Sequence, residues 1–294
     1  MAFPNLIIVG DRINPQGFKN TAKMIAEEDI AGLQALAVKQ VEAGSSFIDV
    51  TIGPRAYEDL KFLQKVVMAL QEAVSVPLCI DYPVKHIVAA CLEVYDPKKS
   101  KGIPPLINSF AETRMDMCDL FDIMPCKVVL MTSEYVDANG SPKSSKKAGD
   151  VVDVARRLVQ KLLKEHGLKH DDIYVDVTVN SMISDMEGLT KMALNAIKTI
   201  SSDPDMKGVH IIGGLTNIGN MLPKIEFGGM SLRHCVENAF LTRAVPMGFD
   251  TVLGTPWTNF SPLPEGHDVL VAFDEIIELK GLDAMRRLRK LWAK

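Results

Sequence analysis

Carboxylate and carboxamide side chains recur where the short apolar runs of this chain end. Asp11 and Asn14 follow the first run, Asp49 lies within the second, and Asp81 and Asn108 end the third and fourth. Later runs lead into further residues of the same two types, which are Asp176, Asn217 and Asn220. Polar and charged side chains are costly to bury unless they are paired or hydrogen-bonded. We therefore expect these residues to meet in one polar site that binds a ligand.

Helix capping is the alternative interpretation for each of these residues taken singly. An Asp or Asn ahead of a helix accepts hydrogen bonds from the first backbone amides of that helix. This explanation suits Asp49 or Asp81 as well as a binding role does, and it suits Asn217 less well. Capping would not, however, place Asp or Asn inside apolar runs such as LCIDYP, LINSF and YVDVT. Recurrence in several runs therefore favours a shared site.

The residue types at these ends limit the chemistry of the site. Asp and Asn dominate it, whereas a catalytic metal usually takes His beside carboxylates. His210 lies inside a predicted strand and is the histidine whose surroundings most need checking. We expect no metal site, because the six histidines show no ligand spacing and fit surface or hydrogen-bonded core positions: His86, His166, His170, His210, His234 and His267.

A neutral heterocycle rich in hydrogen-bond donors suits such a site. A pterin is one example, because its 2-amino group and ring NH present two parallel donors to one carboxylate, while Asn serves donor and acceptor atoms alike. A phosphate site would instead require a Gly-rich loop with Lys or Arg. Gly213-Gly214 offers backbone amides but no Lys follows it. The backbone amides remain available to a neutral ligand, and we expect Gly214 to contact it.

Eight short apolar runs alternate with longer amphipathic segments. Continuous apolar runs are typical of strands buried on both faces, and strict alternation of strands and helices predicts a parallel sheet. Eight repeats fit a closed (β/α)8 TIM barrel of the α/β class, formed by residues 1–294 as a single domain, with an open doubly wound sheet as the alternative. The predicted strands are Leu6–Val9, Phe47–Val50, Leu78–Asp81, Leu106–Asn108, Lys127–Met131, Ile173–Val177, Val209–Gly213 and Thr251–Leu253.

The segments between the strands carry apolar residues at helical spacing. Gly44 and Gly167 stand where two of these helices should end. A polar stretch at Ala138–Ala148 is expected to be a loop within the same domain. The predicted helices are Thr21–Ala43, about Glu58–Ala73, Val151–His166 and Leu189–Ile200.

Composition excludes several classes of protein. With 47% hydrophobic and 24% charged residues the chain is an ordinary globular one, and its net charge of −4 disfavours a nucleic-acid binder. Five cysteines without a CxxC spacing disfavour a disulfide framework or a zinc site, and Cys79 fits a small buried residue. No run approaches the roughly 20 apolar residues of a membrane span. The first residues do not form a signal peptide, so we expect a cytoplasmic protein.

Six motifs, in chain order, resemble the pterin-binding methyltransferases: GDRIN, DVTIGP, LCIDYP, LINSF, YVDVTV and GGLTNIGN. The resemblance runs through nearly the whole chain. It is strongest to the methyltetrahydrofolate:corrinoid protein methyltransferases of acetogens and of anaerobic O-demethylase, methylamine or betaine systems. The folate module of cobalamin-dependent methionine synthase is a more distant relative. The resemblance implies a homodimer that moves a methyl group, in either direction, between N5 of 5-methyltetrahydrofolate and the cobalt of a corrinoid carried by a partner protein.

The resemblance also assigns roles to single positions. Asp81, Asn108 and Asp176 match the pterin-ring ligands, and Asp176 matches the carboxylate that grips the 2-amino and ring NH edge. Asn217 matches the asparagine beside N5 and its methyl group, which makes it the expected catalytic residue. The other matched positions are Asp11, which is Glu in some relatives, Asn14 in the same motif, and Asn220, where relatives can carry Gln.

Two positions depart from the pattern of the family. Relatives often read Asp-x-Asn-x-Gly at the second strand, where this chain has Thr51 in place of Asn. Relatives often carry Ser or Thr after the third-strand Asp, where this chain has Tyr82-Pro83. The three matched ring ligands are unaffected, so the changes bear on the detailed hydrogen bonding around the ring.

Two other functions share part of this pattern. Dihydropteroate synthase resembles the chain at the ring ligands, but it uses Lys and Arg near strands seven and eight, where this chain reads GGLTN and LGTPWTN. A non-catalytic pterin- or corrinoid-binding module is the third interpretation. Such a module needs no group at N5, so Asn217 favours the methyltransferase.

Overall fold

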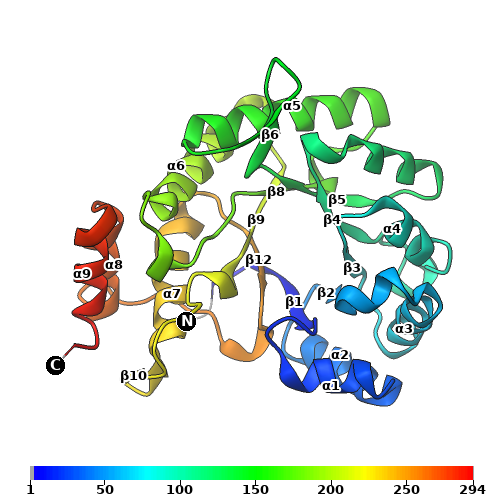
Figure 1. Cartoon of the computed structure of the whole chain (residues 1–294), viewed down its shortest axis with the longest axis horizontal. Coiled ribbons are helices and arrows are strands. Elements are labelled where there is room, and N and C mark those ends of the chain that lie inside the picture. Colours follow the sequence, from blue (N-terminus) through cyan, green and yellow to red (C-terminus); the bar gives the residue numbers. More distant parts are fainter. Residues whose placement is uncertain (1–2, 294) are drawn as a thin grey trace.

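Eight parallel strands close into a barrel in the computed structural model, which describes residues 3–293 (Figure 1). Around the barrel the strands follow the order β1-β2-β3-β4-β5-β8-β9-β12, so each strand pairs with its neighbours along the chain. The predicted (β/α)8 barrel is therefore confirmed. The strands are β1 (Ile7–Ile13), β2 (Phe47–Val50), β3 (Leu78–Asp81), β4 (Leu106–Phe110), β5 (Lys127–Met131), β8 (Ile173–Asp176), β9 (His210–Gly214) and β12 (Thr251–Gly254).

Side chains alternate between the barrel interior and the helices along each strand. An apolar cluster inside the barrel contains Phe47 of β2, Cys79 of β3 and Tyr174 of β8. The residue two positions further along each of these strands faces the same interior. In this way β2, β3 and β8 each present an aspartate to the interior at their carboxyl ends, where a TIM barrel has its active site.

Helices surround the barrel and cover its outer face (Figure 1). Asp59 begins one of them by accepting a hydrogen bond from the backbone N–H of Phe62, and Gly167 ends another in the left-handed conformation that glycine tolerates best. The helices are α1 (Lys19–Ala26), α2 (Ile30–Glu42), α3 (Leu60–Ala73), α4 (Lys85–Leu92), α5 (Ala148–His166), α6 (Leu189–Ser202), α7 (Leu232–Ala244), α8 (Asp268–Ile277) and α9 (Gly281–Arg289).

The single helix predicted over Thr21–Ala43 is wrong, because the structure has two helices there. α1 ends at Ala26, Glu28 takes a positive φ of 53°, and α2 begins at Ile30. The Asp29 side chain accepts a hydrogen bond of 2.8 Å from Gly32 N and so caps α2. A capping carboxylate starts a new helix and so competes with continuation of the one before it. The break was missed because the apolar spacing continues on both sides of Asp29.

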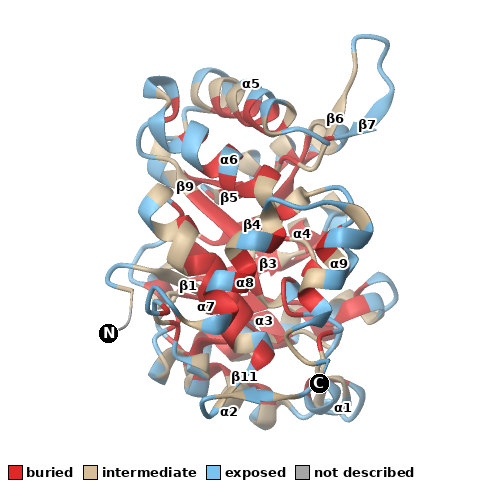
Figure 2. Cartoon of the chain, turned by 90° about the vertical axis from the view of Figure 1, so that its left-hand side faces the viewer, coloured by how far each residue is buried: buried red, intermediate tan, exposed pale blue. Residues whose placement is uncertain are grey.

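The polar loop predicted over Ala138–Ala148 is partly wrong. Its segment Pro142–Ser144 forms strand β7, which pairs antiparallel with β6 (Glu134–Val136). The resulting hairpin projects from the body of the molecule (Figure 2). A second small hairpin joins β10 (Glu226–Phe227) to β11 (Met230–Ser231). Both hairpins are polar, short strands that lack the apolar pattern used to predict the barrel.

Buried residues fill the strands and the inward faces of the helices (Figure 2). Cys79 is buried inside the barrel, as predicted, and all five cysteines are free thiols. Within residues 3–293, no helix combines the length and the apolar character needed to cross a membrane.

Candidate functional site

Asp81, Asn108 and Asp176 lie on neighbouring or facing strands at the carboxyl end of the barrel. Asp81 and Asn108 are direct partners in the β3–β4 register. Burial raises the pKa of Asp81 to about 6, and the negative charge of Asp176 adds to this rise. Burial also raises the pKa of Asp176 to about 6. These two carboxyls are therefore close enough to interact, and both lie in surroundings that disfavour their charged forms.

Backbone geometry after β8 holds the carboxylate of Asp176 in place. The backbone N–H of Thr178 donates a hydrogen bond of 2.7 Å to Asp176 Oδ1. Thr178 adopts a positive φ of 58°, which is rare and strained for a β-branched residue. Such strain persists where the surroundings enforce it, and it clusters at functional sites. One oxygen of Asp176 is thus fixed by the chain, and the other remains available to a ligand.

Asp11 is bound by two hydroxyl groups from the far end of the chain. Thr216 Oγ1 donates to its Oδ2 at 2.9 Å, and Thr255 Oγ1 donates to its Oδ1 at 3.0 Å. Burial raises the pKa of Asp11, and the two hydroxyls partly oppose that rise. Asp11 therefore ties β1 to the loops that follow β9 and β12, on the wall of the site.

Asn217 and Asn220 stand on the turn that follows β9. Asn220 Nδ2 donates to Asn217 Oδ1 at 3.3 Å. A Cβ atom placed on Gly214 would lie 2.8 Å from Asn217 Nδ2, so the amide group rests directly against the Gly214 backbone. Only glycine at position 214 leaves room for this arrangement. The Asn217 amide nitrogen donates to no acceptor in the described chain, and Asn217 lines a hollow at the barrel mouth.

Two hollows open between these residues at the barrel mouth. The first, of about 250 Å³, and the second, of about 370 Å³, share Asn14 and Gln16 in their walls. The first is lined by Asp11, Asn14, Gln16, Gly17, Phe18, Asp49, Gly214, Thr216, Asn217, Asn220, Arg233 and Leu253. The second is lined by Asn14, Gln16, Thr51, Gly53, Pro54, Tyr57, Asp81, Tyr82 and Pro83. Most of the predicted site residues thus gather around these hollows, whereas Asn108 and Asp176 line neither of them. The individual roles stay predictions.

The two departures from the family pattern are neighbours in space. Tyr82 is buried, and its hydroxyl oxygen accepts a hydrogen bond of 2.6 Å from Ile52 N. Thr51 Oγ1 accepts from Gly53 N at 3.0 Å, and the Thr51 side chain also hydrogen-bonds the Tyr82 hydroxyl. Both residues line the second hollow. The two residues that differ from the family pattern therefore lie together in one wall of the site and interact with each other.

Asp49 was placed in the expected polar site from the sequence, but no ligand contact or catalytic role was predicted for it. Its side chain is only 1% exposed, it lines the first hollow, and neither of its carboxyl oxygens has a hydrogen-bond partner in the described chain. Its position two residues after Phe47 on β2 puts its side chain on the same interior face, and this spacing is the signal that could have given it a role. Phe18, Gln16 and Arg233, from loops and a helix start, were also missed.

The capping interpretation fails for the residues to which it was applied. No backbone amide donates to Asp49, and the helix after β3 begins behind Val84 without a side-chain cap, so Asp81 does not cap it. Asn217 ends the short turn Leu215–Asn217 rather than preceding a helix. These side chains are therefore not explained by helix termini.

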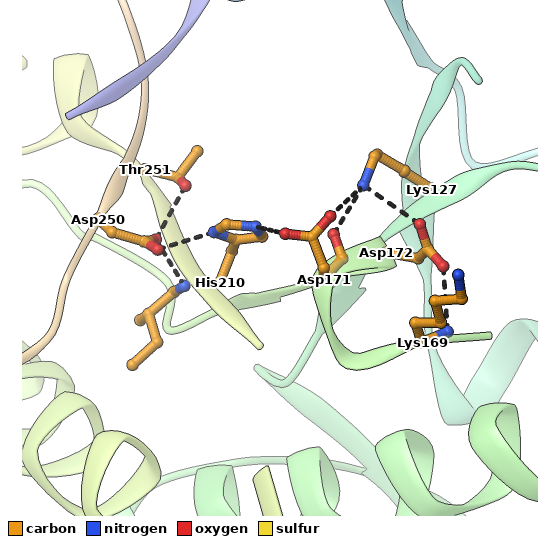
Figure 3. A network of polar contacts seen from close by, with 8 residues as sticks. Lys127, Lys169, Asp171, Asp172, His210, Asp250 and Thr251 are labelled. Atoms are coloured by element: carbon orange, nitrogen blue, oxygen red, sulfur yellow. Dashed lines mark hydrogen bonds and ion pairs between the residues drawn. The ribbon is translucent and has the colours of Figure 1, made fainter. Parts of the chain in front are cut away.

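His210 lies at the opposite end of the barrel and forms a structural network (Figure 3). Its Nδ1 is 2.7 Å from Asp250 Oδ2, and its Nε2 is 3.3 Å from Asp171 Oδ1. Lys127 Nζ continues the network to Asp171 at 3.0 Å. The ring also stacks on Tyr174 at a centroid distance of 4.4 Å. His210 is thus a hydrogen-bonded core residue far from the barrel mouth.

Metal-ligating side chains do not cluster in the part of the chain that the structure covers. Among residues 3–293, no group of three or more His, Cys, Asp or Glu side chains is arranged to hold a metal ion. The carboxyls at the barrel mouth are spread over four strands, with Asp11 already bound by two threonines.

Comparison with known families identifies the class of protein to which this barrel, with Asp and Asn at its mouth, belongs. A model of the family described as "Pterin binding enzyme" matches residues 10–253. The chain belongs to this family. One relative, from Eubacterium limosum, is described as a methylcorrinoid:tetrahydrofolate methyltransferase. It is 30% identical over 258 residues, covering 85% of each chain.

Solved structures with a similar fold include dihydropteroate synthases. The enzyme of Stenotrophomonas maltophilia gives a TM-score of 0.56 at 17% identity, covering 99% of this chain and 94% of that one. The enzyme of Xanthomonas albilineans gives a TM-score of 0.55 at 16% identity, covering 98% and 93%. At this identity the likeness concerns the fold alone.

Proposed function

We propose that this protein moves a methyl group between N5 of 5-methyltetrahydrofolate and the cobalt of a corrinoid protein, in either direction. Membership of the pterin-binding family and the printed activity of the Eubacterium limosum relative support the proposal. The observation that carries it is the position of Asn217, which lines the first hollow at the barrel mouth together with the buried Asp11 and Asp49.

The aspartates and Asn108 suit the donor-rich edge of a pterin. A carboxylate accepts two parallel N–H groups, and an Asn serves one donor and one acceptor. Asp176 has one oxygen held by Thr178 N, and Asp81 lies near it with Asn108 as its strand partner. We propose that these three residues position the pterin ring. Holding the ring in a reactive orientation lowers the barrier to methyl transfer.

The chemical difficulty of the reaction lies at N5. A tertiary amine is a poor leaving group unless its lone pair is protonated or accepts a strong hydrogen bond. Interactions that strengthen in the transition state are the ones that raise the rate. Asn217 is suited to act as that donor, because it lines the first hollow and its amide N–H groups donate to no acceptor in the described chain. Asp11, Asn14, Asn220 and Gly214 complete the proposed contacts in the same hollow.

Cobalt(I) is a strong nucleophile and needs no activation by this chain. The corrinoid is a substrate delivered by a partner protein, and both hollows open at the barrel mouth, where such a partner has access to the ring. We accordingly propose a corrinoid protein as the partner and a homodimer as the assembly, on the strength of the family resemblance.

Dihydropteroate synthesis is disfavoured by the residues that follow β9 and β12. These segments read LTN and TPWTN and carry no Lys or Arg for an anionic leaving group. The likeness to solved synthases is one of fold, so it does not weigh against methyl transfer.

The test is an absorbance assay of cobalt under anaerobic conditions. Cobalt(I) corrinoid and 5-methyltetrahydrofolate are mixed with and without the protein, and conversion of the cobalt(I) spectrum to that of methylcobalt is followed. We expect conversion that scales with protein concentration. Lack of conversion together with condensation of a pterin pyrophosphate and 4-aminobenzoate would instead identify a synthase.

A further inference from the structure

Asp49 is a buried carboxyl group that no part of the described chain satisfies. It lies on β2, is 1% exposed, and both of its oxygens lack hydrogen-bond partners. A buried polar group without a partner is costly and asks for an explanation. Its side chain lines the first hollow together with Asn217. The unpartnered oxygens therefore face a space that a ligand is proposed to fill.

The groups around Asp49 favour its neutral form. Burial raises its pKa well above the usual value, the negative charge of Asp81 on β3 adds to the rise, and that of Asp11 on β1 does so more weakly. Cys79 on β3 is its strand partner, and the nearby thiol opposes the rise. Arg12 is attracted to Asp11, but no cation pairs with Asp49 in the described chain. These surroundings favour the protonated form of Asp49 over its charged form.

Methyl transfer changes the number of protons at N5 by one. When the methyl group leaves N5 for cobalt(I), the cobalt electron pair forms the cobalt–carbon bond. The electrons of the nitrogen–carbon bond stay on N5, which gains a proton to become a secondary amine. In the opposite direction the cobalt–carbon electrons return to cobalt and N5 loses that proton. The site therefore needs one group that can give or take a proton.

We propose that Asp49 is the acid–base residue that holds this proton, giving it to N5 when the methyl group leaves and receiving it in the reverse direction. The inference rests on the proposed methyl transfer. It deepens that function by supplying the proton, a role separate from the hydrogen bond assigned to Asn217. Asp49 and Asn217 line one hollow, so the proton passes between Asp49 and N5 within that hollow.

The other aspartates are less suited to this role. Asp11 already accepts from Thr216 and Thr255, which hold it in place. Asp176 accepts from Thr178 N, and Asp81 lines the second hollow with Tyr82 rather than the first. Asp49 alone among the four has two free oxygens and shares the hollow of Asn217.

The test compares single-turnover methyl transfer to cobalt(I) in the wild type and Asp49→Asn between about pH 5.5 and 8.5. General acid–base groups contribute on the order of 10²–10⁴-fold. We expect Asp49→Asn to bind 5-methyltetrahydrofolate within about threefold of the wild type but to transfer at least about 100-fold more slowly. Its remaining rate should fall about tenfold per pH unit, because the proton then comes from solvent.

For the wild type, the rate of methyl transfer should instead be constant at low pH and fall only as pH rises through the raised pKa of Asp49. Asp49→Ser is a second variant without a titrating group, and Asp59→Asn, a cap at the outer surface, is the matched control. A variant rate within threefold of the wild type, or equal losses of affinity and rate, would overturn the assignment. A wild type without any methyl transfer would overturn the proposed function itself.

Discussion

At the scale of single residues, the carboxyl groups at the barrel mouth lower the stability of the folded protein but suit the binding of a ligand. Asp49 is buried and Asp81 and Asp176 are half-buried near one another, without a cation paired to any of them in the described chain. Burying like charges raises their pKa values and weakens the folded state whenever they ionise. A ligand that brings N–H donors removes this cost, so the empty site is prepared for a donor-rich ring.

The stability of the ligand-free protein should therefore depend on pH through Asp81 and Asp176. The pKa of each carboxyl is about 6 in the folded protein, whereas the unfolded chain releases these protons near the ordinary aspartate pKa of 3.8. Their contribution to stability is fully present below that value and is lost as pH rises to about 6. Asp176→Asn should raise the unfolding free energy at pH 7 by on the order of 1–2 kcal/mol. Urea unfolding at pH 4 and pH 7 checks this, and an unchanged difference between the two pH values contradicts it.

Asp176→Ala should abolish measurable binding of 5-methyltetrahydrofolate. The variant leaves two ring donors without an acceptor in a dry pocket, which costs roughly 2–5 kcal/mol, or about 30- to 5000-fold in affinity. Calorimetric titration of the folded variant measures the loss. Affinity equal to that of the wild type would remove Asp176 from the site.

Asn217→Ala should slow methyl transfer more than it weakens binding. Removing one donor to developing charge typically costs on the order of 10²–10³ in rate. Single-turnover transfer, the dissociation constant and the thermal midpoint are measured together. If rate and affinity fall by the same factor, Asn217 binds substrate and transition state alike. If only the midpoint moves, its role is structural.

At the scale of elements, the turn after β9 places Asn217 through Gly214. A methyl group at position 214 would meet Asn217 Nδ2 at 2.8 Å and displace the amide. Gly214 has a φ of −71°, so alanine fits its backbone without strain. Gly214→Ala should therefore slow transfer by on the order of 10²-fold while the protein stays folded, because a displaced group loses its geometry.

Gly149→Ala is the control for that variant. Gly149 lies in α5, and a Cβ there meets nothing within 4 Å. We expect unchanged transfer and a slight gain in stability, since alanine favours helix over glycine by roughly 1 kcal/mol. Equal transfer rates for both glycine variants would show that the Gly214 contact does not position Asn217.

The barrel strands could be predicted from the sequence because they are apolar runs buried on both faces. The predicted bounds of β2, β3 and β5 agree with the structure, and the aspartates at strand ends follow from side-chain alternation. α7 could not be predicted in this way. It is buried almost all round, including Glu237 and Asn238, so it shows no amphipathic spacing.

The partners of the site residues could not be predicted either. Thr216 and Thr255 reach Asp11 across 205 and 244 positions of sequence, and only closure of the barrel brings them together. The positive φ of Thr178, which directs its N–H to Asp176, runs against the preference of a β-branched residue. Tertiary contacts decide both features.

At the scale of the whole molecule, the two ends of the barrel have different tasks. The carboxyl ends of the strands carry the site, and the amino ends carry the network of His210, Asp250, Asp171 and Lys127 (Figure 3). Such a division is typical of TIM barrels, in which the lower face serves stability. Changes in the network should therefore alter stability without altering the chemistry.

His210→Gln tests this division. Burial favours the neutral ring, but the hydrogen bonds to Asp250 and Asp171 prevail and raise the pKa of His210. The charged ring thus contributes stability that is fully present below its ordinary pKa and is lost as pH rises through the raised value. The variant should have an unfolding free energy about 1 kcal/mol lower than the wild type at pH 6. It should also lack the decrease in stability that the wild type shows above about pH 6.5. Slower methyl transfer at full folding would contradict the separation of the two ends.

The most direct test of the account follows the methyl group itself. 5-Methyltetrahydrofolate with a ¹³C-labelled methyl group is incubated anaerobically with cobalt(I) corrinoid and the wild-type protein, and the ¹³C spectrum is recorded. We predict that the label moves from nitrogen to cobalt with the wild type and stays on nitrogen without protein or with Asp176→Ala. Label that remains on N5 while the wild type binds the folate would contradict methyl transfer as the function of this barrel.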